Sequence, residues 1–252
     1  MKILFPKNIY TRLLCEASPE PLRQNIKFKD ASLISAEVKN GNADVALIPS
    51  YDLMKYPDFF VSGTIAVSFD GELSNSYFYF LPKQNTFTDL YLTGDVTTNE
   101  IILSKLLFSE KYGTEVQLHL SADKVNEIDR NYLIAGDGNL DLSIFNQGMS
   151  FADEISEMLF MPYVNFVAVS RDKKQLSIFN KSLVDIDPVI DSERNNLLEV
   201  MAVPDNVKEY LSNNLNSVYF EMTNSETAGL KELLQLPYLH GIWDDMIDLK
   251  LI

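Results

Sequence analysis

Side chains that can bind an anion follow the apolar runs of this 252-residue chain. Ser50 lies just after the run 45–48, and Thr97, Thr98 and Asn99 precede a helical pattern. Hydroxyl and amide groups donate hydrogen bonds, and the unpaired N–H groups and dipole at a helix start favour a carboxylate or phosphate. The alternative role for each residue is simple helix capping, because Ser, Thr and Asn are preferred cap residues.

A second candidate follows the apolar segment 131–135, which runs into Gly136, Asp137 and Gly138. Glycine permits a tight turn or the close approach of a ligand to the backbone. Asp137 is a candidate site acid, although an aspartate at such a position more often caps a turn. The glycine spacing does not match the dinucleotide-binding fingerprint.

The residues that usually carry metal or redox chemistry are few. The chain has one cysteine, Cys15, and two histidines, His119 and His240, which are far apart in the sequence. The spacing typical of metal ligands does not occur, nor does a nucleophile-elbow, phosphate-loop or zinc-protease motif. We therefore expect no metal and no cofactor, and we expect Cys15 to be a buried residue on a helix.

The composition limits the partners and the compartment. A net charge of −15 argues against nucleic acid as a partner, because its binding depends on clustered Lys and Arg. The sequence has no run of about 18 apolar residues, so we expect no membrane partner. A single cysteine fits a reducing compartment, and the N-terminal stretch is not typical of a secretory signal, so we expect a cytoplasmic protein.

Strand and helix patterns alternate at the start of the chain. Residues 2–5 and 44–50 are predicted to be buried strands, and residues 9–17 and 31–41 are predicted to be helices. Strand, helix and strand in this order indicate a parallel α/β unit. In such sheets ligands bind beyond the carboxyl ends of the strands, which is where Ser50 lies.

The remaining elements predict two lobes. We expect strands at 64–71, 76–83, 90–92, 131–135 and 164–170, and helices at 95–113, 150–159, 192–201, 204–215 and 225–241. The first two of these strands are joined by a turn at Asp70 and Gly71, and the last helix is expected to stop near Pro237. Apolar strands enclose a middle segment, which predicts lobes of residues 1–78 with 168–252 and of residues 79–167, with a hinge at 76–83 and 164–170.

Several segments resemble, in the same order, the motifs of a known family. The first are "LISAEVKNGNADVALIPSYDLMK" and "GTIAVSFDGELSNSYFYFLPK", followed by "TGDVTTNEIILSKLLFSEKYG", "YLIAGDGNL" and "FMPYVNFVAVSRD". Together they resemble the chorismate dehydratase branch of the futalosine-pathway menaquinone-biosynthesis family, over nearly the whole chain. The resemblance implies a type 2 periplasmic-binding-protein fold, in which two α/β lobes close over a small carboxylate-bearing ligand in a cleft between them.

The resemblance also implies ligand contacts. The residues at the matching positions are Thr11, Ser50, Asn75 or Ser76, Thr97, Asn99, Gly136 and Asp137. Thr98 is a further candidate, from the helix-start pattern described above. The chain departs from the family at Tyr10, which stands where the family has an asparagine. It departs again at 149–158, where an Asp-Leu-Gly sequence and a tryptophan of the family are missing.

Three functions are compatible with these patterns. The first is a cofactor-independent lyase that removes water from chorismate, with the carboxylates held by Ser50, Thr97, Thr98 and Asn99, and with Asp137 or a ligand carboxylate as base. The second is a solute-binding-like protein that closes on a small anionic metabolite without this chemistry. The third is a sensor or interaction module that has kept the fold. A base within hydrogen-bond reach of the ligand distinguishes the lyase from the binding protein.

Overall fold

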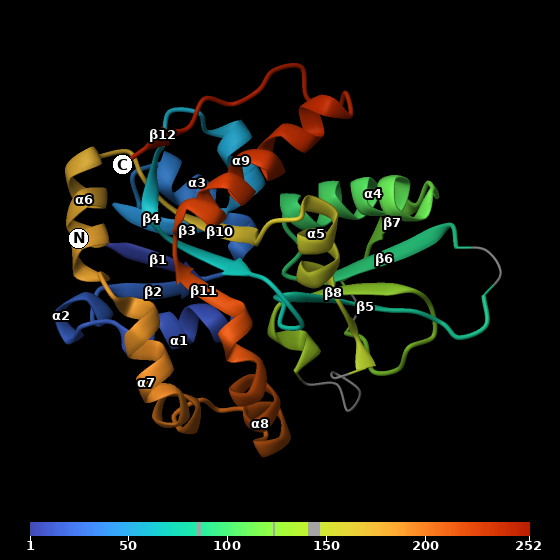
Figure 1. Ribbon diagram of the computed structural model, residues 1–252, viewed down its shortest axis with the longest axis horizontal. Helices are drawn as coiled ribbons and strands as arrows, with labels where there is room; N and C mark the ends of the chain where they lie inside the picture. Colours follow the sequence, from blue (N-terminus) through green and yellow to red (C-terminus); the bar gives the residue numbers. More distant parts are fainter. Residues whose placement is uncertain (85–86, 123, 141–146) are drawn as a thin grey trace.

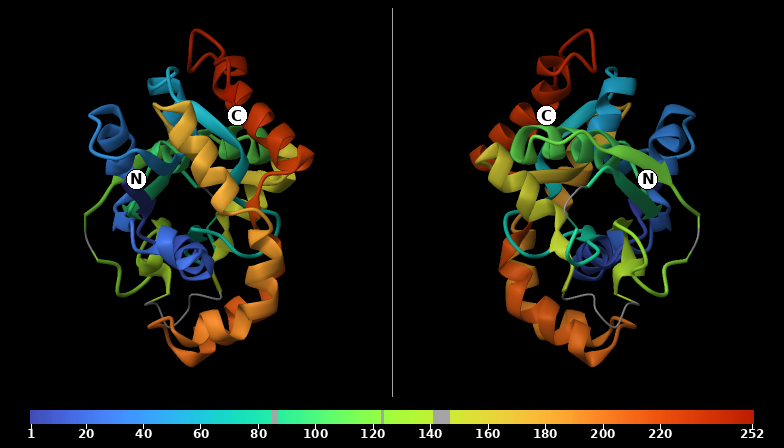
Figure 2. Two further views of the ribbon diagram at one scale, coloured as in Figure 1. Left: turned by 90° about the vertical axis from the view of Figure 1, so that its left-hand side faces the viewer. Right: turned by 90° about the vertical axis from the view of Figure 1, so that its right-hand side faces the viewer.

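The computed structural model describes residues 1–84, 87–122, 124–140 and 147–252. Its strands form two sheets, and helices flank both, so that two α/β lobes lie side by side (Figure 1). Both chain ends lie in the first lobe, whose helices α7 (Ile186–Glu199) and α8 (Asp205–Asn214) extend away from its sheet (Figure 2). Within the described part of the chain, no helix is long and apolar enough to cross a membrane.

The sheet of the first lobe has its most apolar strands in the middle. Its order is β11 (Val218–Glu221), β4 (Phe60–Phe69), β10 (Tyr163–Ser170), β3 (Val45–Pro49), β1 (Ile3–Pro6) and β2 (Ile26–Lys29), with β12 (Lys250–Leu251) beside β4. The pairs β1–β2 and β1–β3 are parallel, whereas β10 is antiparallel to both β3 and β4. Every residue of β3 and β10 is buried, which explains their continuous apolar runs.

Helices cover this sheet, and local sequence signals begin several of them. They are α1 (Ile9–Ala17), α2 (Glu20–Arg23), α3 (Ala31–Lys39), α6 (Lys173–Ser182), α7, α8 and α9 (Asn224–Leu239), with short 3-10 turns η1 (Ser50–Lys55) and η4 (Leu215–Ser217). Asn8 begins α1, because its side chain accepts a hydrogen bond from the Thr11 amide. Thr223 and Glu226 form a capping box that begins α9.

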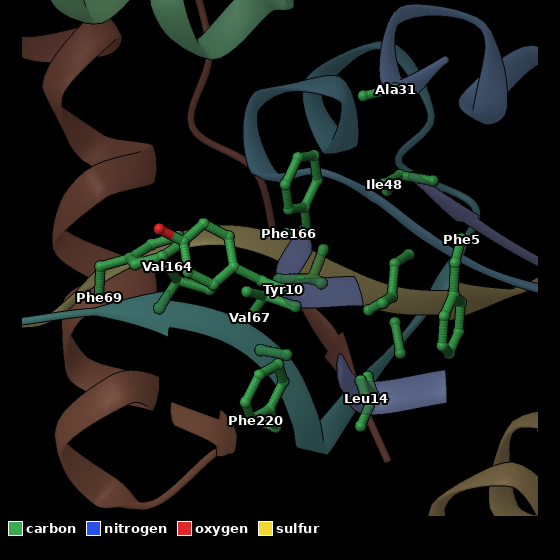
Figure 3. Packing of buried hydrophobic residues seen from close by; sticks show 14 of the residues in the cluster. Phe5, Tyr10, Leu14, Ala31, Ile48, Val67, Phe69, Val164, Phe166 and Phe220 are labelled. Atoms are coloured by element: carbon green, nitrogen blue, oxygen red, sulfur yellow. The ribbon is translucent and has the colours of Figure 1, made fainter. Parts of the chain in front are cut away.

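The core of the first lobe fills the space between the sheet and these helices. Figure 3 shows Phe5, Leu14, Phe166 and Phe220 among its side chains, and each is buried. Burying one side chain of this size contributes roughly 1.5–3 kcal/mol. Cys15 of α1 is also buried, which confirms the prediction made for it.

The sheet of the second lobe is smaller and carries the hydroxyl-rich helix. Its order is β7 (Gln117–Leu120), β6 (Asp89–Gly94), β8 (Tyr132–Ala135), β5 (Ser76–Tyr79) and β9 (Met149–Ser150). The helices are α4 (Thr98–Tyr112) and α5 (Phe151–Leu159), with the short turn η2 (Asp137–Asn139) after β8. A capping box of Thr97 and Glu100 begins α4, and Gly113, at φ 60°, ends it in the left-handed conformation.

The chain passes between the sheets twice. The strands predicted at 64–71 and 76–83 were expected to be joined as neighbours by a turn, but β4 and β5 lie in different sheets, so the segment 70–75 is a crossing between lobes. The chain returns through α5 into β10 (Figure 1). The predicted lobe boundaries, after residues 78 and 167, fall within β5 and β10, and each of these strands belongs to a single sheet. The hinge concerns motion between the lobes and stays a prediction.

The last helix ends at Leu239, near Pro237 as predicted, with the proline inside its final turn. A proline inside a helix has no N–H for the carbonyl four residues earlier, here that of Leu233. The Tyr51 hydroxyl donates to this carbonyl at 3.0 Å and replaces the missing bond. A tertiary contact from η1 therefore lets α9 run past its proline.

Candidate functional site between the lobes

Three helical N-termini of the first lobe meet hydrogen-bond acceptors of the second lobe. The first is the start of α1, where the Ile9 amide donates to Asp137 Oδ1 at 2.8 Å. Arg12, one turn further along α1, lies 3.4 Å from Asp137 Oδ2. The N-terminus of a helix favours a negative charge, so Asp137 occupies a position that suits an anion.

The second junction is at the start of α3. Asp95, just after β6 of the second lobe, accepts hydrogen bonds from the amides of Ala31 and Ser32, the latter at 3.3 Å. The preceding residue Asp30 occupies the N-cap position, but its side chain makes no capping bond within the described residues. A carboxylate from the other lobe therefore caps α3 in its place.

The third junction joins η1 to α4 and β10. Asn99 Oδ1 accepts from the Tyr51 amide at 3.0 Å, and Asn99 Nδ2 donates to the carbonyl and the Oδ1 of Asn165 at 2.8 and 2.9 Å. Ser50 Oγ donates to the Val164 carbonyl at 2.6 Å. Asn99 and Ser50 are both 0% exposed. Asn99 joins the second lobe to the first in this conformation, whereas the Ser50 hydroxyl joins η1 to β10 within the first lobe.

The hydroxyls at the start of α4 are likewise paired within the protein. Thr97 Oγ1 and Ser76 Oγ donate to the two oxygens of Glu100 at 2.6 and 2.9 Å. Burial raises the pKa of Glu100, while the hydrogen bonds from Thr97 and Ser76 oppose that shift. Thr98 Oγ1 donates to Asp52 at 2.8 Å and thereby connects α4 to η1.

The other candidate residues lie around the same junctions. The Thr11 hydroxyl donates to the carbonyls of Pro6 and Asn8, inside the first lobe. The Gly136 amide donates to the Asn75 carbonyl at 2.7 Å, and Gly136 has φ 81°, a value that favours glycine. The Tyr10 hydroxyl, at the position of the departure from the family pattern, donates to the Ser74 carbonyl at 3.0 Å.

A small cavity lies at the first junction. Its volume is about 10 Å³, and its lining residues are Ile9, Tyr10, Ser74, Asn75, Tyr77, Gly136, Asp137, Asn139 and Leu140. A cavity of this size has room for about one water molecule. Asp137 is the one carboxylate among the described lining residues. The lobes are therefore closed on one another here.

The structure brings most of the predicted residues to the contact between the lobes, but pairs them differently from the prediction. Ser50 and Asn99 meet at β10, Asp137 meets α1, and Thr98 meets η1, whereas Thr11 is directed to its own lobe. Three residues were missed: Asp95, Asn139 and Asn165. Asp95 follows a strand end just as Ser50 does, so the same pattern could have identified it.

Metal ligands are not grouped in the structure. Among residues 1–84, 87–122, 124–140 and 147–252, no group of three or more His, Cys, Asp or Glu side chains is placed to hold a metal ion. His119 lies 2.7 Å from Asp89, and His240 lies 3.6 Å from Glu110. Both histidines are thus paired with single carboxylates at the surface.

Comparison with solved structures identifies the fold. The chain is similar to protein AF1704 of Archaeoglobus fulgidus, with TM-score 0.63, 14% identity and coverage of 96% of this chain and 98% of that one. It is similar to an ABC transporter protein of Parabacteroides distasonis, with TM-score 0.63, 12% identity and coverage of 98% and 96%. The periplasmic aliphatic sulphonate binding protein SsuA of Escherichia coli gives TM-score 0.56, 11% identity and coverage of 99% and 90%.

The chain has the periplasmic-binding-protein fold. The fold class predicted from the sequence, two α/β lobes of this type, is confirmed. No protein-family model matches the sequence, and a search of curated proteins finds no significant match. At these identities the likeness shows the fold alone, and the function has to be argued from the contact between the lobes.

Proposed function

We propose that this chain binds a small carboxylate-bearing metabolite between its two lobes. The observation that carries the proposal is the pair of second-lobe carboxylates, Asp95 and Asp137, at the N-termini of α3 and α1. Both N-termini present amides that favour an anion. In the ligand-bound protein, a ligand carboxylate takes the place of one or both of these side chains.

Binding requires the lobes to separate. Sites for small ligands usually have volumes of about 300–1,000 Å³, far above the cavity of about 10 Å³ at the α1 junction. The chain crosses between the lobes at 70–75 and again between α5 and β10, and rotation about these segments is the simplest opening. The predicted hinge at 76–83 and 164–170 borders both crossings.

The exchange of carboxylates keeps the cost of opening low. When the lobes separate, Asp95 and Asp137 become hydrated, and the helix N-termini gain the carboxylate of the ligand instead. The net affinity for the ligand is then the difference between the contacts that its carboxylate makes at the helix N-termini and those that Asp95 and Asp137 make there in the closed protein. The two aspartates therefore compete with the ligand for these N-termini. One structural neighbour with this fold is an aliphatic sulphonate binding protein, which supports an anion as the ligand.

The second candidate is dehydration of chorismate, which rests on the sequence resemblance and on one feature of the site. Asp137 lines the cavity and is the candidate base. In the closed protein this carboxylate already accepts a hydrogen bond from the Ile9 amide and lies 3.4 Å from Arg12, so both of its oxygens are engaged within the protein. Anion binding is therefore the better supported function, and the lyase is an outcome of the same experiment.

The test is incubation of the purified protein with chorismate, malate and methanesulfonate, with the thermal midpoint and the product measured in the same samples. We expect a midpoint that rises with the concentration of a carboxylate. Formation of 3-enolpyruvylbenzoate from chorismate would establish the lyase. If none of the three anions shifts the midpoint and no product forms, the binding proposal is wrong.

A further inference from the structure

One buried polar atom at the contact between the lobes has no partner. Asn139, the last residue of η2, is 2% exposed and lines the cavity at the α1 junction. Its Nδ2 donates to the carbonyls of Ile134 and Gly136 at 2.7 and 2.9 Å. Its Oδ1 has no hydrogen-bond partner in the described structure.

The orientation of this amide is fixed by its neighbours. A carbonyl oxygen accepts hydrogen bonds only, so the atom of Asn139 that contacts two carbonyls must be the NH₂ group. The oxygen is then the unpaired atom, and it requires a donor. Buried acceptors without a donor are rare in folded proteins, and each calls for an explanation such as a ligand or an ordered water.

The residue that carries the unpaired oxygen lines the cavity at the start of α1. The same cavity is lined by Ile9, whose amide meets Asp137, and by Asn139. A ligand that enters here and places its carboxylate at the start of α1 also reaches the wall formed by Asn139. The site thus presents a donor for the carboxylate and an acceptor for a second group.

We propose, on the basis of the binding function above, that the site selects carboxylates that also carry a hydroxyl or ammonium group. Asn139 Oδ1 accepts the hydrogen bond from that group. A ligand without a donor would leave this buried oxygen unpaired, and sites built around a hydrogen bond discriminate strongly against such analogues. Asn139 is thereby a specificity-determining residue of the site.

The test is calorimetric titration with two matched pairs, malate against succinate and 3-hydroxybenzoate against benzoate. Each pair differs by one hydroxyl group. We expect the hydroxylated member of at least one pair to bind about tenfold more tightly to the wild-type protein. In Asn139→Ala the ratio falls to about one, whereas in the matched variant Asn180→Ala, a buried asparagine of α6 in the first lobe, it is retained.

Each result decides between the proposals. Equal affinities within both pairs, or a ratio that survives Asn139→Ala, would overturn the role of Asn139 and leave anion binding intact. Absence of binding by all four acids would overturn both proposals for this class of ligand. If Asn139→Ala does not fold, the affinity ratios of the wild-type protein for the two pairs decide whether the site selects ligands with a second donor.

Discussion

Replacement of Asn99 by alanine should weaken the junction that joins the lobes at β10. Asn99 is the first-turn residue of α4 that contacts both η1 and β10 through its side chain. The alanine variant leaves the Tyr51 amide without its acceptor, and it removes two donors from Asn165. All of these groups are buried, so water does not replace the lost bonds without a rearrangement.

The magnitude follows from the groups left unpaired. A buried donor or acceptor without a partner costs about 1–3 kcal/mol. The Tyr51 amide loses its whole partner, whereas Asn165 keeps hydrogen bonds from Ser50 and Tyr163. We therefore expect Asn99→Ala to lower the free energy of unfolding by about 2–4 kcal/mol, a large part of the roughly 5–15 kcal/mol of a typical domain.

Urea unfolding followed by circular dichroism measures this change. The matched control is Asn42→Ala, which removes an exposed asparagine hydrogen-bonded to Glu37 and should change the free energy by less than about 0.5 kcal/mol. A double-mutant cycle with Asn165→Ala should give a coupling of about 0.5–3 kcal/mol. Additive effects, or a loss of under about 0.5 kcal/mol for Asn99→Ala, would refute this account of the junction.

Three further predictions concern the first lobe. Burial raises the pKa of Asp187 to about 6 from its ordinary 3.8, so the folded protein binds the carboxyl proton more tightly than the unfolded chain does. The free energy of unfolding should therefore fall by up to about 3 kcal/mol as pH rises from 4 to 7. Asp187→Asn should flatten this part of the stability–pH curve, and an unchanged curve would contradict the prediction. Tyr51→Phe should cost about 1–2 kcal/mol in urea unfolding, because the Leu233 carbonyl beside the proline loses its donor; an unchanged midpoint would show that another group replaces the hydroxyl. Gly229→Ala should lower the thermal midpoint, because the new Cβ would lie 2.4 Å from the Pro162 carbonyl oxygen, and the roughly 1 kcal/mol gain in helix propensity is smaller than the cost of such a clash; a higher midpoint would contradict the packing.

Elements with strong local signals could be predicted from the sequence. The strand β3 has a fully apolar run between turn residues, and α4 begins with a capping box and ends at Gly113. Short edge strands carry weaker signals: β2 reads Ile-Lys-Phe-Lys, and β7 is half exposed, so both were missed. The helix α6 was also missed, although its N-cap, Asp172, is a typical start signal.

The pairing of the candidate site residues could not be predicted, because it depends on contacts between distant segments. Ser50 was correctly placed at a strand end, but its hydroxyl meets the Val164 carbonyl, 114 residues away. Asp137 was open to two readings, a site acid or a turn cap, and in the structure it caps a helix of the other lobe. The sequence order of strands also suggested that β4 and β5 are neighbours, whereas sheet membership is decided by the whole fold.

The measurement that tests the central claim most directly is calorimetric titration of chorismate and malate into wild-type protein and Asp95→Ala. The control, Asp58→Asn, removes one negative charge at an exposed position near Lys250. If Asp95 competes with the ligand for the start of α3, its removal should tighten carboxylate binding about fivefold, because one helix cap contributes about 1 kcal/mol. Equal or weaker affinity in Asp95→Ala than in Asp58→Asn, or binding by neither acid to any of the three proteins, would contradict the account.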